Sequence, residues 1–278
     1  MAKRHVEVVV LKQLASCLAM PMLVIGPEGD LLFFNESAEP VLGHRFDEIG
    51  EMSRDEWSAL LRTTDDYGAP IKREERPMIA ALERRVPVYN RFWLRGLDGE
   101  RRKIEGTAFP LINLGGELLG VVGIFWDFKR IGGEAGEAGE TQVSRDGRVR
   151  YAVETILTRR LSESLATPVF MVDAEGQLIH FNEAAGLILG RRYEDLATTT
   201  REELYTAFAP RDEDGSLIPP DRHPMAIARE RRELAHRRMT IRDLSGTMRH
   251  VEVTAIPLVG QSGRMLGAFG IFWEIEAS

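Results

Sequence analysis

Cysteine is nearly absent from the 278-residue sequence. Cys17 is the only one, so no internal disulfide can form, and a reducing, cytoplasmic location is expected. No stretch approaches the roughly 18 uninterrupted apolar residues of a membrane-spanning helix. Glu7 and Lys12 interrupt the apolar run at the basic N-terminus, which favours an amphipathic helix over a signal peptide. A net charge of -7 argues against sequence-independent nucleic-acid binding, which requires a basic surface.

Motifs of catalysis and metal binding are missing as well. The sequence has no Gly-x-Ser-x-Gly elbow, no Walker loop, and no kinase or nucleotide-cyclase signature. Its six histidines are scattered, and none stands at metal-ligand spacing from another ligand-type residue. We therefore expect neither enzymatic activity nor a structural metal.

What the sequence does contain is a long internal repeat. FFNESAEPVLG at 33–43 returns as HFNEAAGLILG at 180–190, and GIFW at 123–126 returns at 270–273 with the same offset. Roughly 40 of about 110 aligned positions are identical without a gap. The length suits two domains of about 100 to 150 residues each. A duplicated domain is therefore predicted.

The domain boundaries follow from the repeat and from the segment between its copies. Residues 1–17 are predicted to form a leading amphipathic helix and 18–128 the first domain. Residues 129–147 are rich in Gly and Glu and nearly lack apolar side chains, which predicts a flexible linker. A second leading helix over 148–164 then precedes the second domain, 165–278.

Each copy has the same predicted order of elements: two strands, short helices, then three strands. In the first copy, residues 21–35 indicate a hairpin around a Glu-Gly turn, followed by a short helix between Asn35 and Gly43 as caps. Another helix begins near Pro77. The three later strands are predicted in 88–97, 101–112 and 118–128.

This order and several motifs resemble the PAS (Per-Arnt-Sim) family of sensory domains. FNESA and FNEAA are similar to the family's Asn-x-x-Ala helix start, and GVVGIFWDF and GAFGIFWEI are similar to its last strand. The resemblance covers about 18–128 and 165–275. It implies an α+β fold of two PAS-like domains, each a five-stranded antiparallel sheet with short helices on one face and a leading amphipathic helix. It also implies a signal exit at the end of each last strand, at Trp126, Asp127, Trp273 and Glu274.

The resemblance also bears on cofactors. Light-oxygen-voltage photochemistry needs a cysteine within the flavin-binding helix, whereas Cys17 lies ahead of the first domain, so we exclude that chemistry. In haem-binding relatives the axial ligand is usually a histidine on the helix before the third strand, which makes His223 a haem-ligand candidate. The other interpretation of His223 is a polar residue at an exposed helix start. We predict no cofactor, and a haem- or flavin-binding redox sensor stays an alternative.

A small pocket between sheet and helices is the ligand site that the resemblance implies. Strand alternation selects its candidate lining as Phe92, Leu94, Ile104 and Ile124 in the first copy, and Met239, Ile241, Val251 and Ile271 in the second. The alternative for each residue is a dry, packed core. Because this lining is mostly aliphatic, a ligand should carry little charge. The first copy holds more aromatic residues, so the second pocket is expected to be the roomier one.

The leading helices carry apolar stripes at helical spacing, which include Val10, Leu14 and Leu18, and Val149, Val153, Ile156 and Leu157. In PAS proteins such a helix commonly packs on the sheet and forms the dimer contact, so a homodimer is expected. Covering the domain's own sheet is the other interpretation, and both can hold at once.

These observations together predict a non-enzymatic, cytoplasmic signalling protein of bacterial type. Its tandem PAS domains are expected to sense a small apolar ligand or a partner. The chain ends soon after its last strand, so we expect the signal to pass in trans to a partner protein. A ligand-free PAS dimerisation scaffold is the main alternative.

Overall fold

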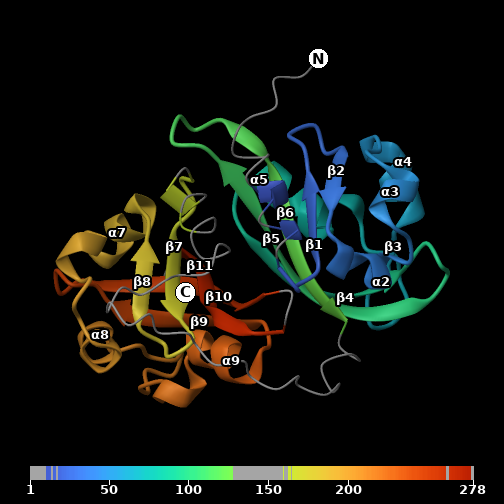
Figure 1. The fold of residues 1–278 in the computed structure, drawn as a ribbon. Helices are drawn as coiled ribbons and strands as arrows, with labels where there is room; N and C mark the ends of the chain where they lie inside the picture. Colours follow the sequence, from blue (N-terminus) through green and yellow to red (C-terminus); the bar gives the residue numbers. More distant parts are fainter. Residues whose placement is uncertain are drawn as a thin grey trace. The chain divides into compact units, whose positions relative to one another are not determined.

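The computed structural model describes residues 11–13, 15–16, 18–127, 159, 162–163, 165–260 and 263–276. The chain divides into two compact units, Met1–Ala135 and Gly136–Ser278 (Figure 1). The division falls within 129–147, the predicted linker. All of this linker and most of both leading segments lie outside the described residues. In the parts that are described, no helix combines the length and hydrophobicity needed to cross a bilayer.

The first unit is built on one antiparallel sheet of six strands. Their order across the sheet is β2-β1-β6-β5-β4-β3, so the last strand lies beside the first (Figure 1). The strands are β1 (Met22–Ile25), β2 (Leu31–Phe34), β3 (Arg62–Thr64), β4 (Val88–Arg95), β5 (Arg101–Ile112) and β6 (Leu118–Asp127).

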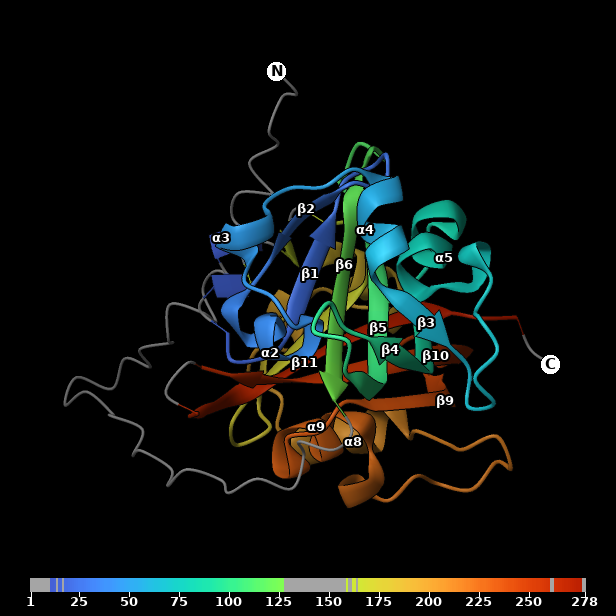
Figure 2. The same ribbon diagram turned by 90° about the vertical axis from the view of Figure 1, so that its right-hand side faces the viewer.

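Short helices lie between β2 and β4 in the chain and cover one face of this sheet. Figure 2 shows α4 in front of the upper ends of β6 and β5, with α3 and α5 to either side of it. The helical segments are η1 (Glu36–Ala38), α2 (Glu39–Leu42), α3 (Phe46–Ile49), α4 (Arg54–Leu60), η2 (Arg73–Glu75) and α5 (Pro77–Arg84).

The second unit repeats this arrangement on a five-stranded antiparallel sheet with the order β8-β7-β11-β10-β9. Its strands are β7 (Val169–Asp173), β8 (Leu178–Phe181), β9 (Ala235–Arg242), β10 (Met248–Val259) and β11 (Met265–Glu274). Its helical segments are α7 (Glu183–Leu189), η3 (Tyr193–Asp195), α8 (Arg201–Phe208), η4 (Pro220–Arg222) and α9 (Pro224–Arg231). The predicted α+β class is confirmed for both units.

The prediction of five strands is confirmed for the second unit and one strand short for the first. The extra strand, β3, contains two β-branched threonines and pairs with β4, where Thr63 lies opposite Leu94. The position aligned with Thr63 is Pro210, which has no N–H to donate to a ladder. Ala209 before it adopts a left-handed backbone with φ of 41°. No strand forms through that pair, and only the next residue, Arg211, pairs with Thr240 of β9 as an isolated bridge.

The predicted helix caps are confirmed in both units. The side chain of Asn35 accepts a hydrogen bond from the backbone N–H three residues on, and Asn182 does the same at the start of α7. Gly43 and Gly190 end these helices with φ of 86° and 77°, a conformation that glycine adopts without strain.

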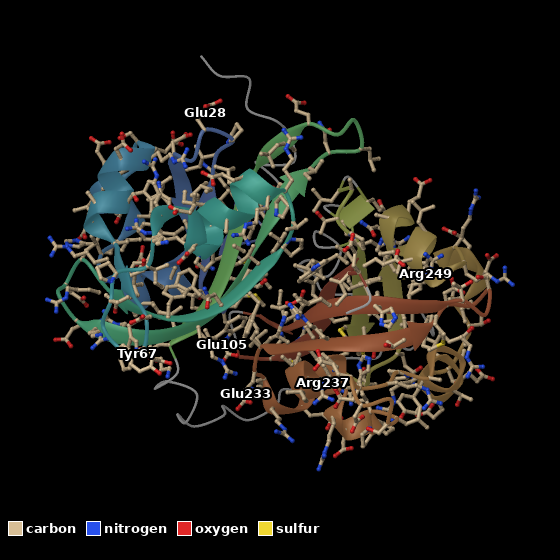
Figure 3. All side chains as sticks on the ribbon, turned by 180° about the vertical axis from the view of Figure 1, so that it is seen from behind. Glu28, Tyr67, Glu105, Glu233, Arg237 and Arg249 are labelled. Atoms are coloured by element: carbon tan, nitrogen blue, oxygen red, sulfur yellow. The ribbon has the colours of Figure 1, made fainter. Side chains whose placement is uncertain are left out.

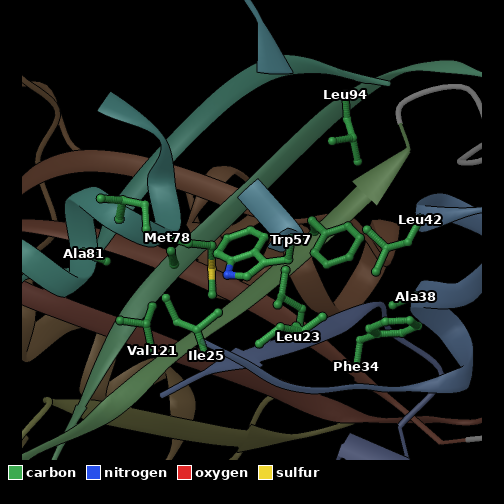
Figure 4. Packing of buried hydrophobic residues seen from close by; sticks show 14 of the residues in the cluster. Leu23, Ile25, Phe34, Ala38, Leu42, Trp57, Met78, Ala81, Leu94 and Val121 are labelled. Carbon is green, nitrogen blue, oxygen red and sulfur yellow. The ribbon is translucent and has the colours of Figure 1, made fainter. Parts of the chain in front are cut away.

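The core of the first unit lies between the inner face of the sheet and the helices. Figure 4 shows Trp57 of α4 and Met78 of α5 packed with Leu23 and Ile25 of β1. The Trp57 indole N–H donates to the carbonyl of Gly29 at 2.8 Å, so its one polar atom is satisfied. Burial of each such large side chain stabilises the fold by about 1.5–3 kcal/mol.

Candidate functional site

A cavity of about 80 Å³ lies between the sheet and the helices of the first unit. Side chains of β1, β4 and β5, and of α2, α4 and α5, form much of its wall, and Leu23, Leu42, Trp57 and Met78 are among them. One water needs roughly 10–15 Å³ on this measure, so the cavity has room for several waters or for part of a small molecule. An adjacent cavity of about 10 Å³ shares Leu23 and Trp57.

The candidate pocket residues of the first copy, Phe92, Leu94, Ile104 and Ile124, all line this cavity. In the second unit, Met239, Ile241 and Val251 belong to one buried core cluster. Whether any of the eight candidates contacts a ligand stays a prediction.

Ile124 lines the cavity, but neither Ile124 nor Ile271 belongs to a core cluster, whereas the phenylalanine that follows each of them does. Across the β5–β6 ladder, Ile124 lies opposite Thr107, whereas Phe125 lies opposite Gly106. Residues directly opposite each other share a face of the sheet. Phe125 and Phe272 accordingly belong to the core clusters, while Ile124 and Ile271 are buried outside them. Because each last strand is a long apolar run, the sequence does not show which of its residues face the core.

One glycine helps to explain why the first unit holds an open space at this place. Gly106 faces inward on β5, and the aligned residue of the second unit is Val253, which is buried in the second core cluster. A Cβ added at Gly106 would approach the Ile124 carbonyl oxygen to 2.9 Å, so the strands pack too closely there for a side chain. The cavity therefore lies in the unit that we expected to be the tighter one.

Three polar residues, Arg76, Thr63 and Thr107, belong to the otherwise apolar wall of the cavity. Arg76, the residue before α5, donates from Nη1 to the carbonyl oxygen of Ser58 at 3.2 Å and to its hydroxyl at 2.7 Å. Its Nε is buried and has no hydrogen-bond partner in the described part of the chain, and the same holds for the hydroxyl of Thr63. Sequence reasoning missed Arg76 and Thr63 in this role, because strand alternation says nothing of a helix start or of an unforeseen strand.

A buried asparagine ties the leading segment to each domain. Asn35 Oδ1 accepts from the N–H groups of Met22 and Ala38 at 2.9 and 3.1 Å. Its Nδ2 donates to the carbonyl oxygens of Ala15 and Met20, each at 2.8 Å, with a longer contact of 3.4 Å to that of Leu18. Three segments therefore meet at one side chain.

Asn182 makes the same set of bonds in the second unit. Its Oδ1 accepts from the N–H groups of Val169 and Ala185, each at 3.0 Å. Its Nδ2 donates to the carbonyl oxygens of Ser162, Leu165 and Thr167 at 3.0, 3.1 and 2.8 Å. From the sequence, the repeated asparagine predicted only a helix cap. Its hydrogen bonds to the leading segment could be identified only in the structure.

Both units match known families over nearly their whole lengths. Residues 19–128 match the PAS domain family and residues 156–275 match the PAS fold family. The chain is a tandem PAS-domain protein. PAS domains are sensory modules, so the coarse function of both units is signal sensing.

Similar solved structures come from PAS and light-oxygen-voltage proteins. A PAS domain from Colwellia psychrerythraea is 18% identical, with a TM-score of 0.32, and the match covers 43% of this chain and 97% of that one. The PAS domain of Bordetella pertussis BvgS is 19% identical, with a TM-score of 0.30, over 44% and 85%. An RNA-binding light-oxygen-voltage receptor is 13% identical, with a TM-score of 0.34, over 92% and 95%. None of the curated proteins compared with the chain matches it.

The opposite face of the first PAS sheet carries a charged cluster. Arg91 pairs with Glu105 at 3.0 Å, and Tyr89 donates a hydrogen bond to the same carboxylate. Burial raises the pKa of Tyr89, and its bond to Glu105 raises it further, so the phenol stays protonated. Figure 3 shows the position of Glu105 on this sheet.

The second PAS domain has a histidine in the matching cluster. His236 Nε2 lies 2.9 Å from a Glu252 oxygen, and its Nδ1 lies 2.9 Å from the Thr254 hydroxyl. The hydrogen bond from His236 lowers the pKa of Glu252. These clusters lie beside the predicted signal exits, because Trp126 is opposite Glu105 and Trp273 is opposite Glu252.

The other two exit candidates are the last residues of their strands. Asp127 lies opposite Ile104 at the end of β6. Glu274 ends β11, and its carboxylate pairs with Arg249 at 3.1 Å. A role of Trp126, Asp127, Trp273 and Glu274 in passing a signal stays a prediction.

His223 has a structural task in the second domain. It is the N-cap residue of α9, and its Nδ1 accepts a hydrogen bond from the Met225 N–H at 3.3 Å. Burial lowers the pKa of His223 to about 4, and the charge of Arg237 adds to this effect, so the ring is neutral at pH 7. A haem-ligand role for His223 stays untested.

The stripe proposed for dimer formation lies mostly outside the described residues. This applies to Val10, Leu14, Val149, Val153, Ile156 and Leu157, and also to Cys17. Leu18 is described and only 4% exposed, and Leu11 and Ala15 are fully buried. The described part of the first stripe therefore fits the interpretation in which this segment covers apolar surface of its own chain.

Proposed function

We propose that the protein is a non-enzymatic sensor whose first PAS domain binds a small molecule and whose signal passes in trans to a partner protein. The observation that carries this proposal is the cavity of about 80 Å³ in the first domain. Protein interiors are otherwise close-packed, and a space of this size costs stability unless a ligand uses it. A cytoplasmic location and a homodimer belong to the same proposal.

The contacts around Asn35 supply a route from this cavity to the leading segment. Leu23 and Leu42 line the cavity. Leu23 follows Met22 in β1, and Leu42 lies in α2, which begins directly after Ala38, and Asn35 accepts the N–H groups of Met22 and Ala38. The same side chain holds the carbonyl oxygens of Ala15 and Met20. A ligand that fits the cavity better in one arrangement of these segments shifts the population toward it. The leading segment then presents a changed surface to the partner.

The second PAS domain favours a different task, that of a ligand-free interaction module. Val253 and Met239 are 6% and 5% exposed and belong to a core cluster at the inner positions of its sheet. This makes the scaffold alternative applicable to one half of the chain.

Native mass spectrometry of the full chain purified from its host tests this proposal, with an absorbance spectrum of the same sample. Phe92→Trp enlarges a side chain in the cavity wall, and Met239→Trp makes the matched change in the second domain. We expect the wild-type chain and Met239→Trp to carry an extra mass that is lost on denaturation, and Phe92→Trp to lose most of it.

If the extra mass is retained in Phe92→Trp and lost in Met239→Trp, the second domain binds the ligand, and the assignment of sensing to the first domain is wrong. Visible absorbance of the preparation would identify a haem or a flavin instead of a colourless ligand. An apo mass in every sample, from cells grown under several conditions, would support the scaffold function for both domains.

A further inference from the structure

The wall of the first cavity combines an apolar lining with a cation that faces no carboxylate there. Of the residues that form this wall, all of them described, none is an aspartate or a glutamate, while Arg76 is one of them. Neighbouring arginines are paired differently, since Arg54 contacts Glu83 at 3.2 Å and Arg73 contacts Asp55 at 3.5 Å. The described hydrogen bonds of Arg76 go to the uncharged Ser58.

Arg76 is held in place but keeps an unused donor. Its Nη1 is fixed by the carbonyl and the hydroxyl of Ser58, so the guanidinium has a defined position. Its buried Nε has no partner among the described residues. A buried donor without an acceptor costs free energy, and an anionic acceptor would make a strong, charge-assisted hydrogen bond with it.

Two further features of the cavity wall favour an oxygen-bearing head group. Thr63 shares the inward face of Leu94, its ladder partner, and its buried hydroxyl has no described partner. Helix α5 begins at Pro77 beside Arg76, and no side chain caps its first turn. The N–H groups of an uncapped helix start attract negative charge, and Met78 of that turn lines the cavity.

The second domain shows what this arrangement looks like without the anion-binding features. His223 replaces Arg76 and caps α9 with its own Nδ1, and Pro210 replaces Thr63. Tyr205, which replaces Ser58, donates to the Ile218 carbonyl. The donors are therefore satisfied or absent there.

We infer that the first PAS domain recognises a small carboxylate: an apolar body in the cavity and a carboxylate head at Arg76, with Thr63 and the start of α5 as further donors. This inference rests on the proposed sensing function and names the class of ligand. It replaces the expectation of a ligand with little charge, because Arg76 was not among the residues that alternation selects.

Ligand-observed NMR titration of the full chain tests the inference with matched pairs of probes. Hexanoate is compared with hexanamide, and phenylacetate with phenylacetamide, so that shape is kept and charge is removed. We expect each carboxylate to bind at least about tenfold more tightly than its amide, since a hydrogen bond to a charged group contributes about 1.5–3 kcal/mol. Arg76→Gln should abolish this difference.

Arg73→Gln is the matched control, because it removes an exposed arginine three positions away that pairs with Asp55. It should leave the preference intact. Arg76→Lys keeps the charge without the planar guanidinium and should restore part of it. Hydrogen exchange of peptides from β4 and β5 verifies that each variant is folded.

Equal affinity for acid and amide, or a preference that survives in Arg76→Gln, would overturn the carboxylate inference. If the amides bind to the wild-type chain and Phe92→Trp abolishes this binding, the proposed sensing function is still supported. If none of the four probes binds to the wild-type chain, the inference fails, while the mass measurement on protein from its host still decides the sensing function by itself.

Discussion

The two PAS domains of this chain share a scaffold and differ in what they place inside it. The shared part includes the capping asparagines, Asn35 and Asn182, whose side chains bond to five equivalent backbone groups each. The differing part includes Gly106, Arg76 and Thr63 of the first domain, all of which line its cavity.

This division shows where architecture and chemistry reside in a duplicated domain. Positions that set strand turns, helix ends and the tie to the leading segment are the same in both copies, because the backbone geometry depends on them. Positions on the inner face are free to change volume and polarity. One copy can therefore place a glycine at a position of the cavity wall where the other buries Val253 in its core.

The largest expected effect tests the shared part. Asn35→Ala should destabilise the first domain by about 3 kcal/mol or more, because it leaves several buried N–H and carbonyl groups without partners. Asn182→Ala should do the same to the second domain. Hydrogen exchange followed by mass spectrometry measures both effects, since each domain yields its own peptides.

Asn→Asp at the same positions separates the two halves of this interaction. Aspartate still accepts the two N–H bonds but cannot donate to the three carbonyl oxygens, one of which, that of Ala15 or Ser162, belongs to the leading segment. We expect fast exchange in the peptides around Ala15 in Asn35→Asp and around Ser162 in Asn182→Asp. Wild-type protection there would show that the leading segments do not depend on these bonds.

Most of the fold followed from local signals in the sequence, and most of the site did not. The turn glycines, the capping asparagines and the repeated GIFW strand each determine structure over only a few residues. Their structural effect could therefore be predicted from the sequence. The extra strand β3 and the wall positions of Arg76 and Thr63 depend on how distant segments pack, which periodicity does not encode. The inward phase of the last strand was ambiguous because Val121 to Phe125 is apolar on both faces.

A smaller effect is expected from exchanging side-chain volume on β5 and β10. Gly106→Ala places a Cβ 2.9 Å from the Ile124 carbonyl oxygen, which should destabilise the first domain by about 1–3 kcal/mol. Val253→Ala removes two buried methyl groups and should cost the second domain about 1–3 kcal/mol. Chemical denaturation followed by domain-resolved hydrogen exchange measures both.

The two variants would affect stability for opposite reasons, one by crowding and one by loss of contacts. Gly106→Ala should also weaken hexanoate binding, whereas Val253→Ala should leave it unchanged. A first domain made more stable by Gly106→Ala would mean that the strands have room there, and the explanation of the cavity by close strand packing would be wrong.

The smallest expected effect concerns a histidine that stands where the first domain has Phe33. His180 is 5% exposed, and neither ring nitrogen has a hydrogen-bond partner among the described residues. Burial lowers the pKa of His180, and Arg159 lowers it further, while Glu163 and Glu194 act in the opposite direction. The ring is therefore neutral in the folded domain at pH 7.

A lowered pKa makes the stability of the second domain fall in mild acid. The unfolded chain takes up the proton near its ordinary pKa of about 6.5, before the folded domain does, so the contribution is intact above that pH and is lost as the pH falls toward the folded value. His180→Phe should remove this slope and stabilise the domain by about 1 kcal/mol at pH 7, because two unsatisfied polar atoms leave the core. Phe33→His should create the same slope in the first domain. Unfolding curves at pH 7.5, 6.5 and 5.5 measure both, and an unchanged slope in His180→Phe would assign the acid sensitivity to other groups of the second domain.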